Sequence, residues 1–175
     1  AEWLHDQVES LDGLVKAANV AVEGEARRHG GCRLLKSVPG IGWIRAATIV
    51  AHVTHPGRFR TKRQFWCYCG FAVVTYSSDD WEIVESRLVR KSRQRTTRGL
   101  NRKYNRHLKG VFKGAAKTSC GAQGIFKPHF DYLVASGMRD SMARLTVARK
   151  IAATSLVIWK KGEKFDPGKA VIKTV

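Results

Sequence analysis

The sequence predicts a mainly α-helical protein: a helix-hairpin-helix, further helices around a short irregular or β-prone segment, and an N-terminal coiled-coil-like helix. Three observations predict this fold. Apolar residues recur at helical spacing near the N-terminus, a Pro-Gly-Ile-Gly run separates two helical stretches at 34–53, and helical periodicity returns over about 100–160. The expected division is a coiled-coil-like helix over 1–30, a main domain over 31–168 and an irregular tail over 169–175.

The N-terminal stretch has apolar residues that alternate steps of four and three, namely Leu4, Val8, Leu11, Val15, Ala18 and Val22. This is the a/d pattern of a heptad repeat. It predicts either the end of a coiled coil or an amphipathic helix that faces the core, and the acidic flanks favour the coiled coil. We therefore expect this segment to stand partly free of the body and to pair with another helix. Because the chain opens with Ala1 in mid-pattern, we also expect a piece of a longer protein.

The segment 34–53 is the most informative part of the chain. A helix is expected to stop at Pro39, and Gly40 can adopt the positive φ that a tight hairpin needs. Gly42 would open the second helix and let a ligand approach the backbone, while Ile41 would fill the apolar seam between the helices. Free N–H groups and the positive end of the helix dipole would then form a phosphate site. The alternative is a tight helical hairpin with structural glycines. The local sequence favours phosphate binding at Gly40 and Gly42.

The charge distribution predicts a polyanionic partner. The chain has 32 Lys and Arg against 14 Asp and Glu, a net charge of +18 and a pI near 10.3. Between Glu85 and Asp131 there is no acidic residue, and the basic residues there are Arg87, Arg90, Lys91, Arg93, Arg95, Arg98, Arg102, Lys103, Arg106, Lys109, Lys113, Lys117 and Lys127. A one-sided basic block beside a phosphate-binding hairpin is typical of nucleic-acid binding.

The middle of the chain changes character after the hairpin. His55-Pro56-Gly57 predicts a turn, and 61–69 a short helix. The run Phe71–Tyr76 is β-prone, Ser77-Ser78-Asp79-Asp80 is turn-like, and Trp81–Val89 is expected to return as a strand.

Helical periodicity is expected to resume near Leu100. One apolar stripe contains Leu100, Tyr104, Leu108, Val111 and Ala115. A neighbouring stripe contains Arg102, Arg106, Lys109 and Lys113. Such a helix can pack by one face and lie along a phosphate backbone by the other. Two more helices are expected at about 128–135 and 141–160, separated by Gly137 and a capping Asp140, with an irregular tail after Gly162.

The four cysteines, Cys32, Cys67, Cys69 and Cys120, do not form a metal-binding pattern. The Cys67-x-Cys69 spacing is too short for a zinc knuckle, and no histidine follows at ligand spacing. The pair lies in an apolar helical run, where a buried cysteine behaves as a small hydrophobe. We interpret all four as reduced thiols of a cytoplasmic protein. Neither a run of 18 apolar residues nor a signal peptide is present, so no membrane partner is expected.

Several short motifs occur in a characteristic order. They are Pro39-Gly40-Ile41-Gly42, Arg58-Phe59, Cys69-Gly70-Phe71, Tyr76-Ser77-Ser78, Asn105-Arg106-His107-Leu108-Lys109, Ala115-Ala116, Ala148-Arg149-Lys150-Ile151-Ala152, Trp159-Lys160 and Gly162-Glu163-Lys164-Phe165-Asp166-Pro167. From about Leu34 to Pro167, the chain resembles the C-terminal domain of insertion-sequence transposases of the one-hundred-and-ten, one-hundred-and-sixteen and nine-hundred-and-two class. These are relatives of the Piv-type DNA invertases.

The resemblance implies a DNA transposase in which a serine forms a covalent link to DNA. The matching residue is Ser78, with Ser77 as the neighbour that could be confused with it. Arg87, Arg90 and Arg98 are the nearest candidates to stabilise the charge of the phosphorane. The resemblance also implies a separate N-terminal RuvC-like domain that carries Mg²⁺, so that this chain itself holds no cofactor. The implied partners are DNA, a guide (bridge) RNA and further copies of the full-length protein, in the bacterial cytoplasm at the nucleoid.

The sequence departs from the family pattern near the expected nucleophile. Asp79 and Asp80 replace a Gly-Gly pair, Val73 replaces a proline, and Tyr104 replaces a glycine. One alternative is therefore a non-catalytic helix-hairpin-helix module that binds nucleic acid, or a decayed transposase fragment. A DNA glycosylase would need a catalytic carboxylate after the hairpin, and 52–65 contains none, so we set that class aside.

Overall fold

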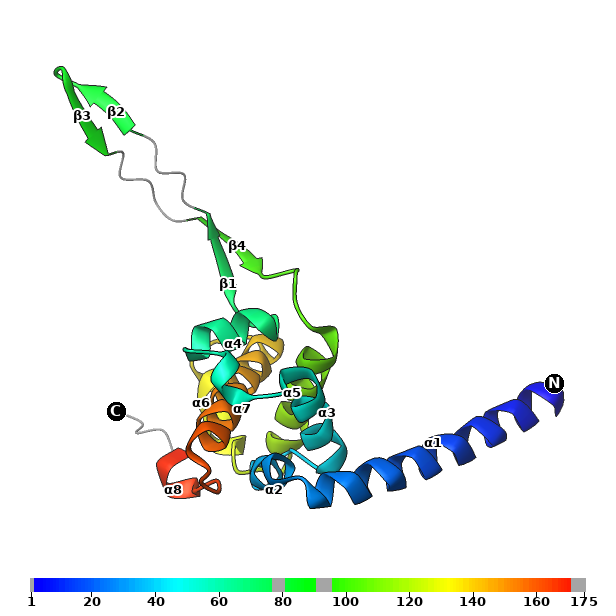
Figure 1. Cartoon of the computed structure of the whole chain (residues 1–175). Coiled ribbons are helices and arrows are strands. Elements are labelled where there is room, and N and C mark those ends of the chain that lie inside the picture. Colours follow the sequence, from blue (N-terminus) through cyan, green and yellow to red (C-terminus); the bar gives the residue numbers. More distant parts are fainter. Residues whose placement is uncertain (1, 77–80, 91–95, 171–175) are drawn as a thin grey trace.

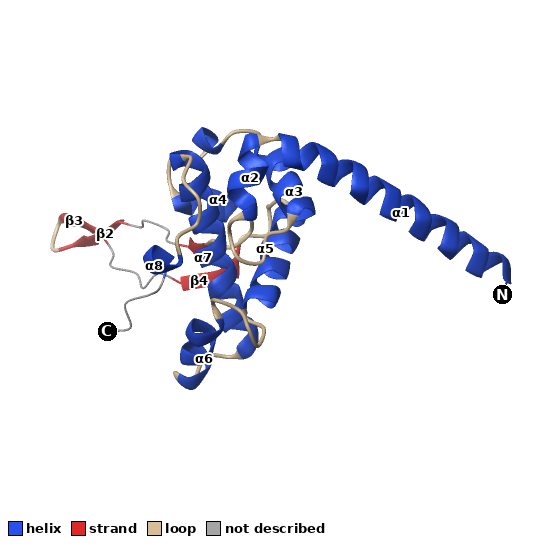
Figure 2. Cartoon of the chain, turned by 90° about the horizontal axis from the view of Figure 1, so that it is seen from below, coloured by secondary structure: helices blue, strands red, loops and turns tan. Residues whose placement is uncertain are grey.

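The computed structural model describes residues 2–76, 81–90 and 96–170. A body of packed helices carries two projections, a long N-terminal helix α1 (Glu2–Arg28) on one side and β-ribbons on another (Figure 1). The view from below shows the same separation, with α1 and the strands leaving the body on different sides (Figure 2). The mainly helical fold predicted from the sequence is therefore confirmed.

The body is assembled around one central helix, α7. The helices of the body are α2 (Gly30–Lys36), α3 (Trp43–Val53), the 3-10 helix η1 (Pro56–Arg58), α4 (Lys62–Tyr68), α5 (Arg106–Ser119), α6 (Lys127–Ala135), α7 (Asp140–Lys161) and the short α8 (Pro167–Ala170). Helix α7 packs against α2, α4, α5 and α6. It buries residues on several sides, including Val147, Ala148 and Ile151. This is why its apolar residues do not form one stripe.

Aromatic side chains fill the core between α4, α5 and the chain entering the ribbon. The rings of Phe65 and Phe112 meet edge to face with centroids 5.8 Å apart, and Phe71 meets Phe112 at 6.3 Å. All three side chains are almost completely buried. Edge-to-face pairs of this kind add to the free energy gained from burial. They fix α5 against α4, which positions the basic face of α5.

The hairpin between α2 and α3 has the predicted geometry. Gly40 adopts φ +78°, and Ile41 and Val38 are buried in the core. A residue with a side chain rarely adopts that backbone conformation. The hairpin predicted from Pro39-Gly40-Ile41-Gly42 is thus confirmed, with Ile41 in the seam as expected.

Helix α1 leaves the body almost completely exposed. Leu4, Val8 and Leu11 are 61%, 57% and 58% exposed, and the buried residue of the helix is Ala26, near its end. The expectation that this segment stands free of the body is confirmed. The alternative, a helix that buries its stripe in the core of its own chain, is wrong.

The β-prone region forms two antiparallel ribbons. Strands β1 (Val73–Tyr76) and β4 (Thr96–Leu100) pair at the body, and β2 (Trp81–Val84) and β3 (Arg87–Arg90) pair further out (Figure 1). The single strand predicted over 81–89 is wrong. Glu85 and Ser86 have φ of 50° and 61° and turn the chain back. Two successive positive φ values match a tight hairpin turn, which a sequence without Asn or Gly there does not signal.

Two predicted helix starts are also wrong. Helix α5 begins at Arg106, because the Asn105 side chain caps it by accepting a hydrogen bond from the Leu108 N–H at 3.0 Å. Leu100 therefore lies on β4, and Arg102 and Tyr104 lie in the loop before the helix. Helix α7 is preceded by Arg139, so Asp140 is its first residue and not its cap.

Candidate nucleic-acid interface

The two glycines of the hairpin have different surroundings. A Cβ atom on Gly40 would collide with the Ala115 carbonyl oxygen and with the Ser119 hydroxyl of α5. Gly40 therefore lets the hairpin pack closely on α5. Gly42 has an ordinary φ of −86°, is exposed, and has no described atom near the position of its missing Cβ. Of the two, Gly42 is the glycine that leaves the backbone open to a ligand.

Arg45 connects the hairpin to α5. Its guanidinium donates a hydrogen bond of 2.6 Å to the Gly40 carbonyl and one of 3.3 Å to the Thr118 hydroxyl. Gly42 is the residue before α3 and has no side chain that could accept a hydrogen bond. The first N–H groups of the helix therefore receive no capping bond from it. The start of α3 thus combines free backbone donors with a fixed arginine next to α5.

Helix α5 presents a basic face beside its buried face. Leu108, Phe112 and Ala115 are buried, whereas Arg106 and Lys113 are exposed. The apolar stripe of this helix is confirmed for its helical members, and Phe112 belongs to it although it was not predicted.

Lys109 is the half-buried member of the basic face. Its ammonium group lies 4.1 Å from the centroid of the Tyr104 ring, in a cation–π contact. The same ring packs on Gly70, whose φ is +75°. Lys109 is therefore held in place, while its exposed neighbours remain available to a ligand.

Arg102 extends the basic face from a loop that is tied to α4. The Asn101 side-chain oxygen accepts a hydrogen bond of 3.0 Å from the Lys103 N–H, and its amide nitrogen donates one of 2.8 Å to the Lys103 carbonyl. The same amide nitrogen also donates to the Cys67 carbonyl at 3.3 Å. Arg102 and Lys103 themselves are exposed. The loop thus presents two cations at a defined position before α5.

Among the remaining predicted site residues, Arg87 is the one whose side chain the structure describes, and it does not join this face. Arg87 is exposed at the start of β3, beside the turn of the outer ribbon and far from α5 (Figure 1). Strand β1 ends at Tyr76 and β2 begins at Trp81. The segment between them, 77–80, contains Ser77, Ser78, Asp79 and Asp80 and lies outside the described residues. The side chains of Arg90 and Arg98 also lie outside them.

A second basic cluster was missed at the sequence level. Arg58, Arg60, Arg63 and Lys103 line a shallow depression of about 600 Å³ beside α4, and no carboxylate is among its lining residues. The Arg58 guanidinium lies 4.9 Å from the Tyr68 ring centroid. The run from Arg58 to Arg63 holds four basic residues in six, a signal that could have revealed the cluster.

Several residues of the characteristic motifs hold the body together. The Trp66 indole N–H donates to the Arg149 carbonyl at 2.9 Å, and the Lys160 ammonium donates to the Phe59 carbonyl at 2.5 Å. These contacts join residues that are 83 and 101 positions apart. The motifs therefore specify the fold as well as any chemistry.

The cysteines form no disulfide in the described chain. Cys32, Cys69 and Cys120 are buried, and burial raises the pKa of all three thiols, so they are free, protonated core residues. Cys67 is exposed, which corrects the interpretation of this pair as core hydrophobes. Within the described residues, no cluster of His, Cys, Asp and Glu could hold a metal ion, and no helix is long and apolar enough to span a bilayer.

Comparison with protein families decides the identity of this arrangement. The model of the Transposase IS116/IS110/IS902 family matches residues 32–129, which is more than half of the 175 residues. The chain belongs to this transposase family. No curated protein sequence matches the chain.

Membership in the IS116/IS110/IS902 family implies a role in DNA transposition and hence contact with DNA. The matched range starts in α2 and ends in α6, so it contains the hairpin, both ribbons and the basic face of α5. It confirms the resemblance seen in the sequence. The motifs of α7 and of the tail lie outside it.

Proposed function

We propose that this domain binds DNA and supplies the serine nucleophile, Ser78, for strand exchange by a longer transposase. The family match over 32–129 is the observation that carries this proposal. It includes the Tyr76-Ser77-Ser78 motif, whose first residue is the last residue of β1. A covalent intermediate fits the task, because transesterification conserves the energy of the phosphodiester for resealing.

The proposed step exchanges one ester for another. The Ser78 hydroxyl oxygen attacks a DNA phosphorus atom and loses its proton to a base. The bond from phosphorus to one deoxyribose oxygen breaks, and that oxygen leaves with a proton. Attack by a deoxyribose hydroxyl of another strand on the phosphoserine then restores the serine and joins the strands. Arg87, Arg90 and Arg98 remain candidates to stabilise the charge on phosphorus.

The described residues offer a surface suited to DNA. The exposed cations of α5 and the Arg102 loop can contact a phosphate backbone without reading bases. We propose that a separate RuvC-like domain carries the metal. A guide RNA and further copies of the protein, paired through α1, complete the proposed partners.

A covalent adduct assay tests the nucleophile. The full-length enzyme with its RuvC-like domain is incubated with labelled DNA, and denaturing gels reveal protein-linked label. We expect an adduct that is lost in Ser78→Ala and kept in Ser77→Ala, which is the matched control one residue away. An adduct that survives Ser78→Ala contradicts the assignment.

A second candidate function is DNA binding without chemistry, which Asp79 and Asp80 favour because they would repel a phosphate. Both functions require electrostatic binding. Six phosphate contacts would give a log–log salt slope of about −5 for duplex DNA. Replacing Arg102, Arg106 and Lys109 together by Ala should lower the magnitude of that slope by about one per lost contact. Binding with this slope, but with no adduct from any variant, would favour the second candidate.

A further inference from the structure

A groove of about 720 Å³ lies between α5 and the beginning of α7. Its lining residues come from three elements that the fold brings together, and they are Leu100, Lys109, Lys113, Gly114, Lys117, Asp140, Ser141, Met142, Arg144 and Leu145. Its volume is in the range of sites that hold a small ligand or one or two nucleotides. The groove therefore suits a single strand.

One edge of the groove is a row of lysines. Lys109, Lys113 and Lys117 follow one another at intervals of four residues on α5, which places them about 6 Å apart along the helix axis. A row of this kind can follow successive phosphates of one extended strand. Gly114 also lines the groove, and a Cβ atom there would meet the Arg45 guanidinium at 3.0 Å.

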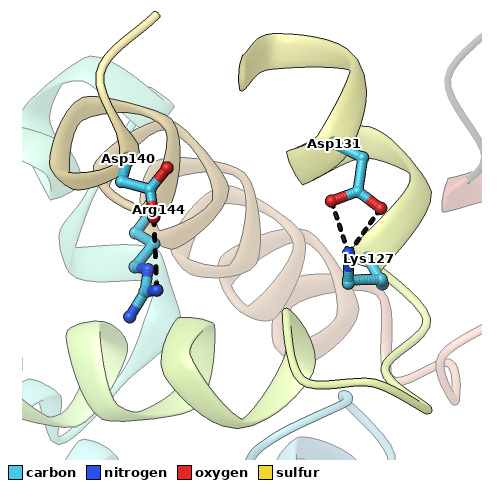
Figure 3. A network of polar contacts seen from close by, with 4 residues as sticks. All are labelled: Lys127, Asp131, Asp140 and Arg144. Atoms are coloured by element: carbon cyan, nitrogen blue, oxygen red, sulfur yellow. Dashed lines mark hydrogen bonds and ion pairs between the residues drawn. The ribbon is translucent and has the colours of Figure 1, made fainter. Parts of the chain in front are cut away.

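The opposite edge adds Arg144, which contributes a fourth cation. Asp140 holds its guanidinium in an ion pair of 3.5 Å, and Figure 3 shows Arg144 pointing from α7 toward α5. The Arg144 guanidinium also lies 5.5 Å from the Phe130 ring centroid. Asp140 and Ser141 begin the 22-residue helix α7, so the positive end of its dipole also lies at this edge. With four cations against one carboxylate, the groove has net positive charge.

The groove also has apolar lining residues. They are Leu100, Met142 and Leu145, and Met142 is 48% exposed. A positively charged channel with an apolar surface is the arrangement by which proteins hold single strands without reading their sequence.

We propose that the groove between α5 and α7 binds a single strand of DNA, with its phosphates along Lys109, Lys113 and Lys117 and its sugars and bases against Met142 and Leu145. This proposal rests on the proposed function, since an enzyme that exchanges strands must hold a strand that is unpaired. It assigns that strand a place in the body, separate from the outer ribbon.

The test compares three labelled probes on the 175-residue chain: a short oligothymidylate, an oligouridylate of equal length and a DNA duplex. The variant Lys113→Gln/Lys117→Gln should weaken oligothymidylate binding by about tenfold and duplex binding by a smaller factor, because Lys113 also belongs to the basic face of α5. Asp140→Asn should strengthen oligothymidylate binding, because it removes the carboxylate of the groove. The matched control, Lys16→Gln/Arg33→Gln, removes two exposed charges elsewhere and should change oligothymidylate binding little.

Three outcomes would overturn the proposal. Equal losses for oligothymidylate and duplex would make these lysines part of a general basic face. Unchanged oligothymidylate binding would exclude the groove, and tighter binding of oligouridylate would show that its ligand is RNA. Each of these leaves DNA binding and the Ser78 adduct intact, whereas a wild-type chain that binds none of the DNA probes would count against the proposed function itself. Thermal melting of each variant verifies that it is folded.

Discussion

The Arg149 guanidinium donates a hydrogen bond from Nε to the Phe71 carbonyl oxygen, 2.8 Å away and 78 positions earlier in the chain. Phe71 is completely buried and comes two residues before β1. The Arg149 carbonyl in turn accepts a hydrogen bond from the Trp66 indole at 2.9 Å. Helix α7 thus holds both sides of the corner where the chain leaves α4 and enters the ribbon, so it fixes the direction in which the ribbon leaves the body.

We expect Arg149→Gln to lower the free energy of unfolding by about 1.5–3 kcal/mol, because it removes a charged donor from a buried carbonyl. Urea denaturation of the purified chain measures the loss. The control is Arg139→Gln, an exposed arginine whose side chain does not cap its helix, which should stay within about 0.5 kcal/mol of wild type. Equal effects of the two substitutions would mean that the contact with Phe71 contributes nothing specific.

Gly40→Ala should destabilise the fold by about 1–3 kcal/mol from backbone strain, because it places a side chain on a backbone with φ +78°. The new Cβ would also collide with Ala115 and Ser119. Gly42→Ala is the matched control, since its φ is −86° and the space around it is open, so it should cost less than about 1 kcal/mol. Thermal or urea unfolding compares the two. A larger effect at Gly42 would contradict the packing role assigned to Gly40.

Gly42→Ser should separate DNA binding from stability. Serine is a preferred residue before a helix, and its hydroxyl would accept a hydrogen bond from the first N–H groups of α3. The variant should therefore be as stable as wild type, yet bind duplex DNA more weakly, because a phosphate at α3 would lose those donors. Fluorescence anisotropy at fixed salt measures the binding. Unchanged affinity would remove the start of α3 from the interface.

Self-association should depend on the exposed heptad stripe of α1. We expect the chain to form oligomers in a concentration-dependent way, and Leu11→Lys/Val15→Lys to shift it to the monomer without lowering its melting temperature. Light scattering after size-exclusion chromatography measures the mass. Ser10→Lys/Ala17→Lys adds the same charge at exposed positions on the side of the helix away from the stripe and should retain association. A wild-type chain that stays monomeric at high concentration would contradict coiled-coil pairing.

Acid should destabilise the fold in part through His129. Burial, together with the nearby charge of Lys150, lowers the pKa of His129 below its ordinary value of 6.5. The unfolded chain therefore binds more protons at this residue than the folded chain when the pH falls below about 6.5. The free energy of unfolding should fall as the pH drops through that range, and less steeply in His129→Gln. A slope that stays the same in His129→Gln would contradict this assignment.

Local signals in the sequence were sufficient for several elements. Gly40 and Ile41 occupy the conformations that Pro39-Gly40-Ile41-Gly42 predicts, since a tight hairpin constrains backbone angles within a few residues. The heptad stripe of α1 predicted an exposed helix because it combined apolar spacing with acidic flanks. Both features depend on neighbours in the chain.

Features that depend on distant residues were not predictable. The start of α5 was predicted too early, because Leu100 and Tyr104 happen to have the apolar spacing of a helix. Leu100 ends strand β4, Tyr104 lies in the following loop, and the helix begins only after its cap, Asn105. The turn at Glu85-Ser86 lacks the usual glycine or asparagine. The groove of Lys113, Lys117 and Arg144 forms because α5 and α7 pack side by side. The sequence pattern of either helix does not predict that the two are neighbours.

The length of α1 has a geometric consequence. A helix of 27 residues spans about 40 Å, which exceeds the width of most small domains. Because the helix is exposed over most of that length, it can change its direction as a unit. A rotation of about 10° at its base would move its far end by about 7 Å. A small change of angle where α1 meets α2 would thus become a large displacement of Trp3 at the other end.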